Sequence, residues 1–186
     1  MRKLYLPILG VTLMLTSCTI GALDSSTPLP ADDHFIFVIG VSPVDAKIVV
    51  DQGEIGNGIF TPDNFSPLTF GGTPDRGYIL SRARGNTMQA IISIQMPRDE
   101  YGKLRLPVAP CGGVKTPVFT GAAGKVIYVG NVRYSRHGER VEPAYSSDID
   151  SAREFLRANY PALAGRLEQG RYELLPTSLR CAVEYE

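Results

Sequence analysis

The groups in this chain best able to do chemistry are three cysteine thiols, Cys18, Cys111 and Cys181. A thiol can act as a nucleophile, bind a metal, accept a lipid or form a disulfide. Nucleophilic catalysis needs a base beside the sulfur, and the sequence has only two histidines, His34 and His137. Neither histidine stands in a motif with a cysteine. The sequence therefore predicts no catalytic residue, no metal site and no cofactor.

Cys18 closes an N-terminal segment that is typical of exported proteins. Two basic residues precede an apolar run over residues 4–15, which is shorter than the roughly 20 residues needed to span a bilayer. The sequence LTSC at positions 15–18 resembles the bacterial lipobox, in which the thiol accepts a diacylglyceryl group. Residues 1–17 are thus predicted as a lipoprotein signal peptide, cleaved between Ser17 and Cys18. An ordinary secretory signal with a chance cysteine is the alternative.

The predicted anchor is the lipid on Cys18. Acyl chains such as palmitate hold a protein on a membrane because each buried methylene contributes roughly 0.8 kcal/mol. Thr19 follows the cysteine, where an aspartate would favour retention in the inner membrane. We therefore expect a cell-envelope protein, lipid-anchored at the outer membrane and facing the periplasm.

The two remaining cysteines are expected to pair. An exported domain folds in an oxidising compartment, where two thiols usually form a disulfide. Once Cys18 carries lipid, the connectivity has a single solution, Cys111–Cys181. Two separate buried thiols are the alternative.

Other candidate groups favour structural roles. The acidic pairs Asp32-Asp33, Asp99-Glu100 and Asp148/Asp150 fit a tether, a turn and a helix start better than a pair of catalytic carboxylates. Residues 121–125 (GAAGK) lack the spacing and the hydroxyl of a phosphate-binding loop. Three arginines, at positions 133, 136 and 140, are interpreted as a charged hairpin end, with an anion-binding patch as the alternative.

Composition points to one folded domain behind a polar linker. The chain has 186 residues, and its 19 basic and 19 acidic residues balance, which argues against a dedicated nucleic-acid binder. Residues 18–33 are polar and contain two prolines, so they are predicted to be a flexible, lipidated tether, with a docked arm as the alternative. Residues 34–186 are predicted to form a single β-rich domain.

Short strands are expected along most of that domain. Runs rich in β-branched and aromatic residues, separated by glycine and proline, predict strands at 35–41, 47–51, 68–70, 78–83, 88–96, 115–119 and 125–134. The last two are expected to form a hairpin around the glycines at 121–124. Within 125–134, alternation places Val126, Tyr128, Val132 and Tyr134 on one face, and Gly130 is interpreted as a bulge or as a close approach of another chain segment.

The C-terminal third contains one clear helix. Ser147-Asp148 offers an N-cap, and apolar residues recur at helical spacing until Tyr160-Pro161, where the helix should end. Ile149, Ala152, Phe155 and Leu156 are expected to pack on the sheet. Residues 179–186 alternate as a closing strand. The predicted fold is mainly β, an antiparallel β-sandwich with one late α-helix; a small β-barrel is the alternative.

Two stretches resemble a known group of proteins. The sequence GKVIYVGNVRY (124–134) and, after a variable loop, SAREFLRANYPAL (151–163) are similar to a strand and a Tyr-Pro-terminated helix of uncharacterised bacterial envelope lipoproteins. The resemblance implies a β-rich periplasmic domain and assigns no catalytic residue.

Three functions remain compatible with these patterns. The favoured one is a non-enzymatic binding or assembly role at the cell envelope, with the membrane and another envelope protein as partners and no nucleic acid. A periplasmic carrier or sensor of a small or lipidic ligand is the alternative. A hydrolase with dispersed acidic groups is the third.

Overall fold

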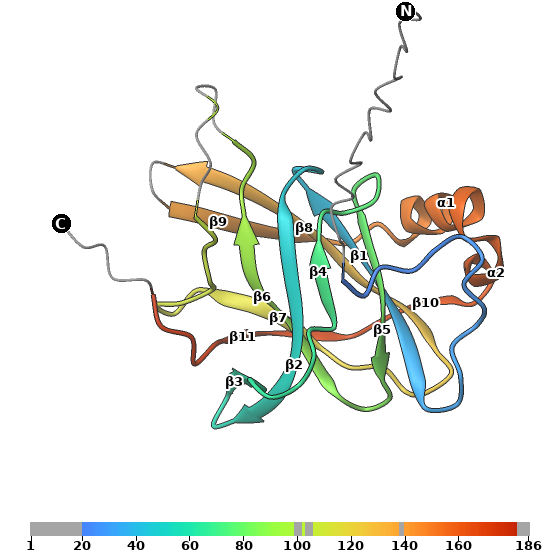
Figure 1. The fold of residues 1–186 in the computed structure, drawn as a ribbon, viewed down its shortest axis with the longest axis horizontal. Coiled ribbons are helices and arrows are strands. Elements are labelled where there is room, and N and C mark those ends of the chain that lie inside the picture. Colours follow the sequence, from blue (N-terminus) through green and yellow to red (C-terminus); the bar gives the residue numbers. More distant parts are fainter. Residues whose placement is uncertain (1–19, 99–101, 103–105, 138–139, 182–186) are drawn as a thin grey trace, which may run out of the picture.

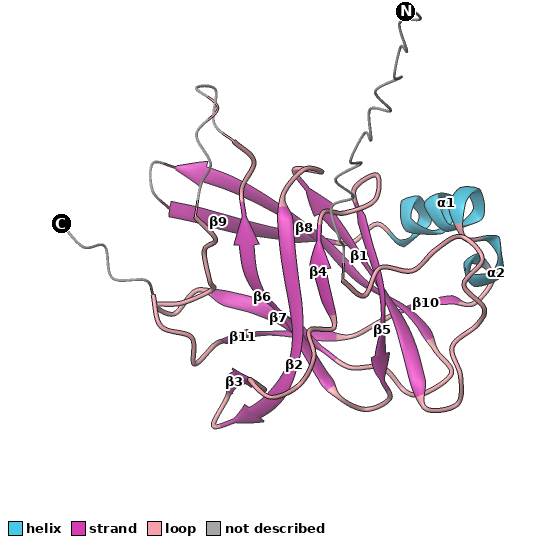
Figure 2. Cartoon of the chain, viewed as in Figure 1, coloured by secondary structure: helices cyan, strands magenta, loops and turns pink. Residues whose placement is uncertain are grey.

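The structure is a computed structural model that describes residues 20–98, 102, 106–137 and 140–181. Two β-sheets form two layers, and two short helices lie beside one of them (Figure 1). The predicted architecture, mainly β with a short late helix, is confirmed (Figure 2).

The first sheet has the strand order β10-β8-β1-β5, with β9 also pairing with β8. Its strands are β1 (His34–Ser42), β5 (Tyr78–Arg84), β8 (Val126–His137), β9 (Arg140–Ser146) and β10 (Leu167–Gln169). The second sheet has the order β11-β7-β6-β2-β3, with β4 pairing with β2. Its strands are β2 (Lys47–Gly56), β3 (Ile59–Pro62), β4 (Phe70–Gly72), β6 (Met88–Gln95), β7 (Lys115–Phe119) and β11 (Tyr172–Pro176).

Strand β1 is buried on both faces, as its continuous apolar sequence predicts. Phe35, Phe37 and Ile39 face the second sheet and belong to the core between the layers. Ile36 and Val38 face the other way and pack against the helices. The first sheet is therefore the central layer of the molecule.

The predicted hairpin between residues 115–119 and 125–134 is wrong. Strand β7 pairs with β6 and β11, whereas β8 pairs in parallel with β1, so the chain crosses from one sheet to the other between them. Backbone hydrogen bonds from Asn86 to Gly121 and from Gly124 to His34 fix this crossing. Strand β1 and the first half of β8 are both apolar and buried, and their pairing places them together in the middle of the first sheet.

The predicted late helix is confirmed, and a second, one-turn helix follows it. Helix α1 (Ile149–Asn159) begins after Asp148, whose side chain accepts a hydrogen bond from the backbone of Ser151. It ends at Tyr160, before Pro161 starts the one-turn helix α2 (Pro161–Ala164). Ala152 and Leu156 are fully buried against the first sheet.

The predicted closing strand is also wrong where the structure describes it. Residues 179–181 are not in a strand, and 182–186 lie outside the described residues. The C-terminal strand is β11, which pairs antiparallel with β7. Leu175 of β11 is buried in a small cluster with Phe60 and Val118, so this earlier segment supplies the edge that the alternating tail was expected to supply.

Residues 20–33 lie against the domain, so the docked arm, rather than the flexible tether, describes them. Ile20 and Gly71 exchange two backbone hydrogen bonds of 2.8 and 3.0 Å. The Ser81 hydroxyl donates to the carbonyl of Gly21, and the Tyr160 hydroxyl donates to that of Leu23. The arm therefore connects the second sheet, the first sheet and the helices.

Candidate ligand pocket between the sheets

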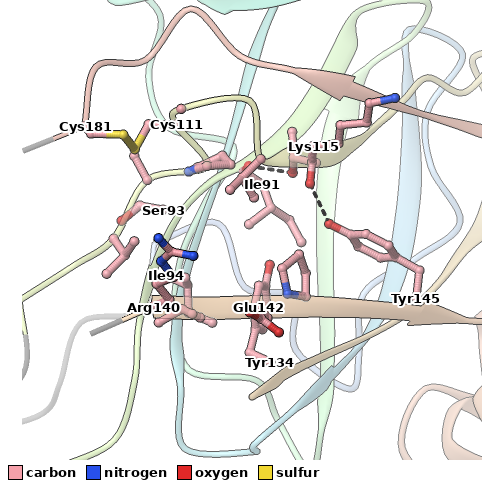
Figure 3. A pocket seen from close by; sticks show the side chains of 18 residues that line it. Ile91, Ser93, Ile94, Cys111, Lys115, Tyr134, Arg140, Glu142, Tyr145 and Cys181 are labelled. Atoms are coloured by element: carbon pink, nitrogen blue, oxygen red, sulfur yellow. Dashed lines mark hydrogen bonds between the residues drawn. A yellow bond between two sulfur atoms is a disulfide. The ribbon is translucent and has the colours of Figure 1, made fainter. Parts of the chain in front are cut away.

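A pocket of about 620 Å³ opens between the two sheets. Strands β6 and β7 form one side, β8 and β9 form the other, and residues 108–112 close one end (Figure 3). This volume lies within the 300–1,000 Å³ usual for small-molecule sites.

The lining is mainly apolar. Its apolar side chains come from both sheets and from the closing segment, and they include Ile91, Ile94, Val108, Val114, Val141 and Pro143. Ile91 and Ile94 also belong to the core between the sheets, and Val141 packs against it. The pocket is thus a hollow continuation of the core at one edge of the sandwich.

The end of the pocket is fastened by a disulfide. Cys111 and Cys181 are bonded, with their Cα atoms 5.1 Å apart, which confirms the predicted pairing. The neighbouring segment is held on β6 by two hydrogen bonds between Ile94 and Val108, 2.9 and 2.7 Å long. The bridge therefore ties residues 177–181 to the pocket rim rather than tying a closing strand to the sheet.

A β-bulge turns Tyr134 into the pocket. In the pairing of β1 with β8, Val38 lies opposite Tyr128 but Ile39 lies opposite Gly130, so one residue is inserted at Val129. An inserted residue reverses the alternation that follows it.

The predicted face assignment of β8 is consequently wrong beyond the bulge. Val126 and Tyr128 pack under the helices, as one face. Val132 and Tyr134 instead join Ile127 in the core between the sheets. Sequence alternation indicated the bulge through Gly130 but did not fix which residue was inserted.

Tyr134 places a polar group in this apolar space. The residue is 9% exposed and lines the pocket. Burial raises the pKa of its phenol well above the ordinary value, and the nearby Tyr145 adds to the shift. Within the described part of the chain, no hydrogen bond to the Tyr134 hydroxyl is formed.

Two other hydroxyl groups of the lining, one buried and one half-buried, donate to backbone carbonyls. The Thr116 hydroxyl donates to the carbonyl of Ile91 at 2.8 Å. The Tyr145 hydroxyl donates to the carbonyl of Lys115 at 2.9 Å, and burial raises the pKa of Tyr145 to about 12. Tyr134 is therefore the buried hydroxyl of the lining that remains free to donate a hydrogen bond to a ligand.

Charged side chains stand at the rim. Of the three arginines in the predicted patch, Arg140 lines the pocket, and its guanidinium points to the same end as Ser93 (Figure 3). Glu142 also borders the pocket, and a carboxylate oxygen of Glu142 lies 4.0 Å from Nε2 of His137. The rim thus carries both signs of charge.

The two candidate acidic pairs within the described residues lie in different elements, one in the arm and one at the start of α1. Asp33 contacts the ring of His34 at 2.7 Å in the arm, while Asp148 caps α1. The Asp99-Glu100 pair lies outside the described residues, as do Ser17 and Cys18 of the predicted cleavage and lipidation site. Across residues 20–98, 102, 106–137 and 140–181, no group of three or more His, Cys, Asp or Glu side chains has metal-binding geometry.

Searches of protein-family models, curated proteins and solved structures give no match to this chain. In the part of the chain that the structure describes, none of the helices has the length and apolar character needed to cross a bilayer.

Proposed function

We propose that the protein is a lipid-anchored, non-enzymatic binding protein of the cell envelope that holds a small, mainly apolar ligand between its two sheets. The observation that carries this proposal is the pocket, with its apolar lining from both sheets and a polar rim. Ligand sites in proteins are typically concave and apolar, with a few placed polar groups. Each Å² of apolar ligand surface buried there would contribute about 25 cal/mol.

The N-terminal sequence supports the anchor. The LTSC sequence at positions 15–18 favours acylation of Cys18, and Thr19 favours the outer membrane, with the domain facing the periplasm. The Cys111–Cys181 disulfide is consistent with an oxidising compartment. A lipid anchor would place the pocket beside a membrane, which is a reservoir of apolar ligands.

The docked arm sharpens this picture. One residue, Thr19, separates Cys18 from Ile20, and Ile20 is already hydrogen-bonded to Gly71. One extended residue spans at most about 3.6 Å. An acylated Cys18 would therefore hold the domain close to the lipid surface rather than at the end of a long linker.

Membrane anchoring is tested by Cys18→Ser in a bacterial host. Acyl labelling and normal maturation should be lost, because the serine hydroxyl cannot replace the thiol that accepts the lipid. Labelling and membrane fractionation equal to those of the unaltered protein would contradict the anchor.

Ligand binding is tested by native mass spectrometry of the full-length protein, purified from membranes. We expect a bound small molecule that is lost in Val141→Trp, because the larger ring fills the pocket from β9. Val44→Trp is the matched control, since Val44 is 58% exposed and is not part of the lining.

The outcome also separates the two binding roles. A copurified molecule that Val141→Trp removes and Val44→Trp retains supports the pocket as the binding site. Absence of any copurified molecule, together with a protein partner crosslinked outside the pocket in both variants, would overturn ligand binding in favour of an assembly role.

A further inference from the structure

We infer that the ligand of this pocket is an acyl lipid, whose carbonyl or carboxyl oxygen accepts a hydrogen bond from the Tyr134 hydroxyl while its hydrocarbon chain lies along the apolar lining. This inference rests on the proposed function and names its ligand class. It follows from the one deep donor in the pocket and from the character of the surfaces around it.

The first step concerns the donor, Tyr134, which is 9% exposed and lines the pocket. Among the described residues its hydroxyl forms no hydrogen bond, and it opens into the pocket instead of being sealed in the core, since the one fully buried side-chain polar atom without a partner there is Nε of Arg82. A hydroxyl that opens into a pocket is hydrogen-bonded by water in the ligand-free protein, and a ligand that displaces this water without offering an acceptor leaves the hydroxyl unpaired, which costs roughly 1–3 kcal/mol. A ligand that brings an oxygen acceptor would satisfy it.

The second step concerns the rest of the lining. Thr116 and Tyr145 already donate to backbone carbonyls, so they offer no free donor to a sugar or another polyhydroxyl ligand. The apolar walls of the same pocket include Ile91, Val141 and Pro143. A matching ligand is therefore apolar over most of its length and has an acceptor oxygen at one place.

The third step concerns the rim. Figure 3 shows Tyr134 on the β8–β9 side, with Ile91 and Ser93 of β6 across the pocket. Arg140 and Ser93 supply a cation and a hydroxyl at the end nearest the disulfide. An acyl group with a polar end fits this order of surfaces, because its chain meets the apolar walls and its oxygens meet the phenol and the rim.

Both a free fatty acid and the acyl ester of a phospholipid have this chemistry. The test uses the full-length protein in phosphatidylcholine nanodiscs with a photoactivatable diazirine on one of two probes, palmitate or a palmitoyl phospholipid. Crosslinked peptides are mapped by mass spectrometry. We expect labelling of the peptides that contain Ile91, Tyr134 and Val141, and the more strongly labelling probe identifies the source.

Competition then tests the hydrogen bond. Unlabelled methyl palmitate, which has the acceptor oxygens, should displace the probe at about one tenth of the concentration that hexadecane requires, as a single net hydrogen bond allows. Tyr134→Phe should remove this tenfold difference while it retains labelling. Tyr128→Phe is the matched control, because Tyr128 lies on the same strand but faces the helices.

The outcomes distinguish the inference from the proposed function. Pocket labelling with equal competition by methyl palmitate and hexadecane in the unaltered protein would overturn the acyl-oxygen contact and leave an apolar pocket. A preference that persists in Tyr134→Phe would overturn the role of Tyr134. Absence of pocket labelling with both probes would overturn the acyl ligand, even if native mass spectrometry finds another molecule bound there.

Discussion

The two ends of strand β8 differ in how they are covered. At Val126 and Tyr128 the strand is buried on the outside by α1 and α2, whose Ala152 and Leu156 are inaccessible to solvent. At Tyr134, beyond the bulge, the same strand faces a pocket of about 620 Å³ between the sheets. One end is filled by the chain itself, and the other is left open. The difference shows that a single continuous strand can serve both a packed core and a binding site.

The two buried tyrosines of β8 differ in the same way, because one hydroxyl has a hydrogen-bond partner in the described part of the chain and the other does not. The Tyr128 hydroxyl accepts a hydrogen bond of 3.0 Å from the backbone of Asp148, and burial raises the pKa of Tyr128 to about 12. Tyr134 has no such partner among the described residues, and burial raises its pKa further. A hydroxyl at the closed end thus positions the start of α1, whereas the one at the open end remains available.

The largest loss of stability is expected when the disulfide at the pocket end is removed. The double variant Cys111→Ser/Cys181→Ser should lower the free energy of unfolding by about 4 kcal/mol, because a bridge across 70 residues restricts the unfolded chain. Urea unfolding with and without reductant measures this loss. A loss below about 1 kcal/mol would show that the pocket end is held by other contacts.

The closed end should respond to loss of packing. Leu156→Ala removes a fully buried side chain between α1 and the first sheet and should cost about 2–5 kcal/mol. Phe155→Ala should cost less, since Phe155 is only partly buried and stacks on Tyr78 with ring centroids 4.5 Å apart. Chemical denaturation measures the loss of stability in both variants. A larger loss in Phe155→Ala than in Leu156→Ala would mean that the helix packs through another face.

The boundary between the two ends is the bulge. Gly130 has a φ of 144°, and a Cβ there would lie 3.1 Å from the carbonyl oxygen of Ser146. Gly130→Ala should therefore cost about 1–3 kcal/mol. Gly165→Ala is the control, because no atom lies within 4 Å of its Cβ position and its φ of −73° suits alanine. Equal stability of the two variants in thermal unfolding would contradict a strained bulge.

The smallest effect should separate the two tyrosines. Tyr128→Phe is expected to lose about 1 kcal/mol of stability, because it removes the hydrogen bond to Asp148. Tyr134→Phe should leave the stability of the ligand-free protein unchanged or slightly raise it, since it removes a hydroxyl that lacks a protein partner. Paired denaturant titrations test this, and an equal loss in both variants would mean that Tyr134 is satisfied within the fold.

Several features of the fold followed from local sequence. The caps and the Tyr160-Pro161 dipeptide gave the bounds of α1, because helix ends depend on nearby backbone and side-chain groups. The Cys111–Cys181 pair followed from the number of cysteines left after Cys18 is assigned to the lipid. The Gly-rich segment at 121–124 indicated a turn correctly, yet the partner strands on either side of it were predicted incorrectly, since pairing is a long-range choice.

The sequence by itself determined that this chain has a β-rich domain with a late helix, because residue type and period reflect whether a segment is buried on one face or two. Only the tertiary structure decided which face of each segment is buried. The bulge at Val129 reversed the second half of β8, and the pairing of β8 with β1 placed Tyr134 between the sheets. The pocket exists because segments distant in sequence come together without filling the space between them: 91–94, 108–116, Tyr134 and 140–145. Local sequence patterns do not indicate such a pocket, since each of its walls is an ordinary apolar strand face.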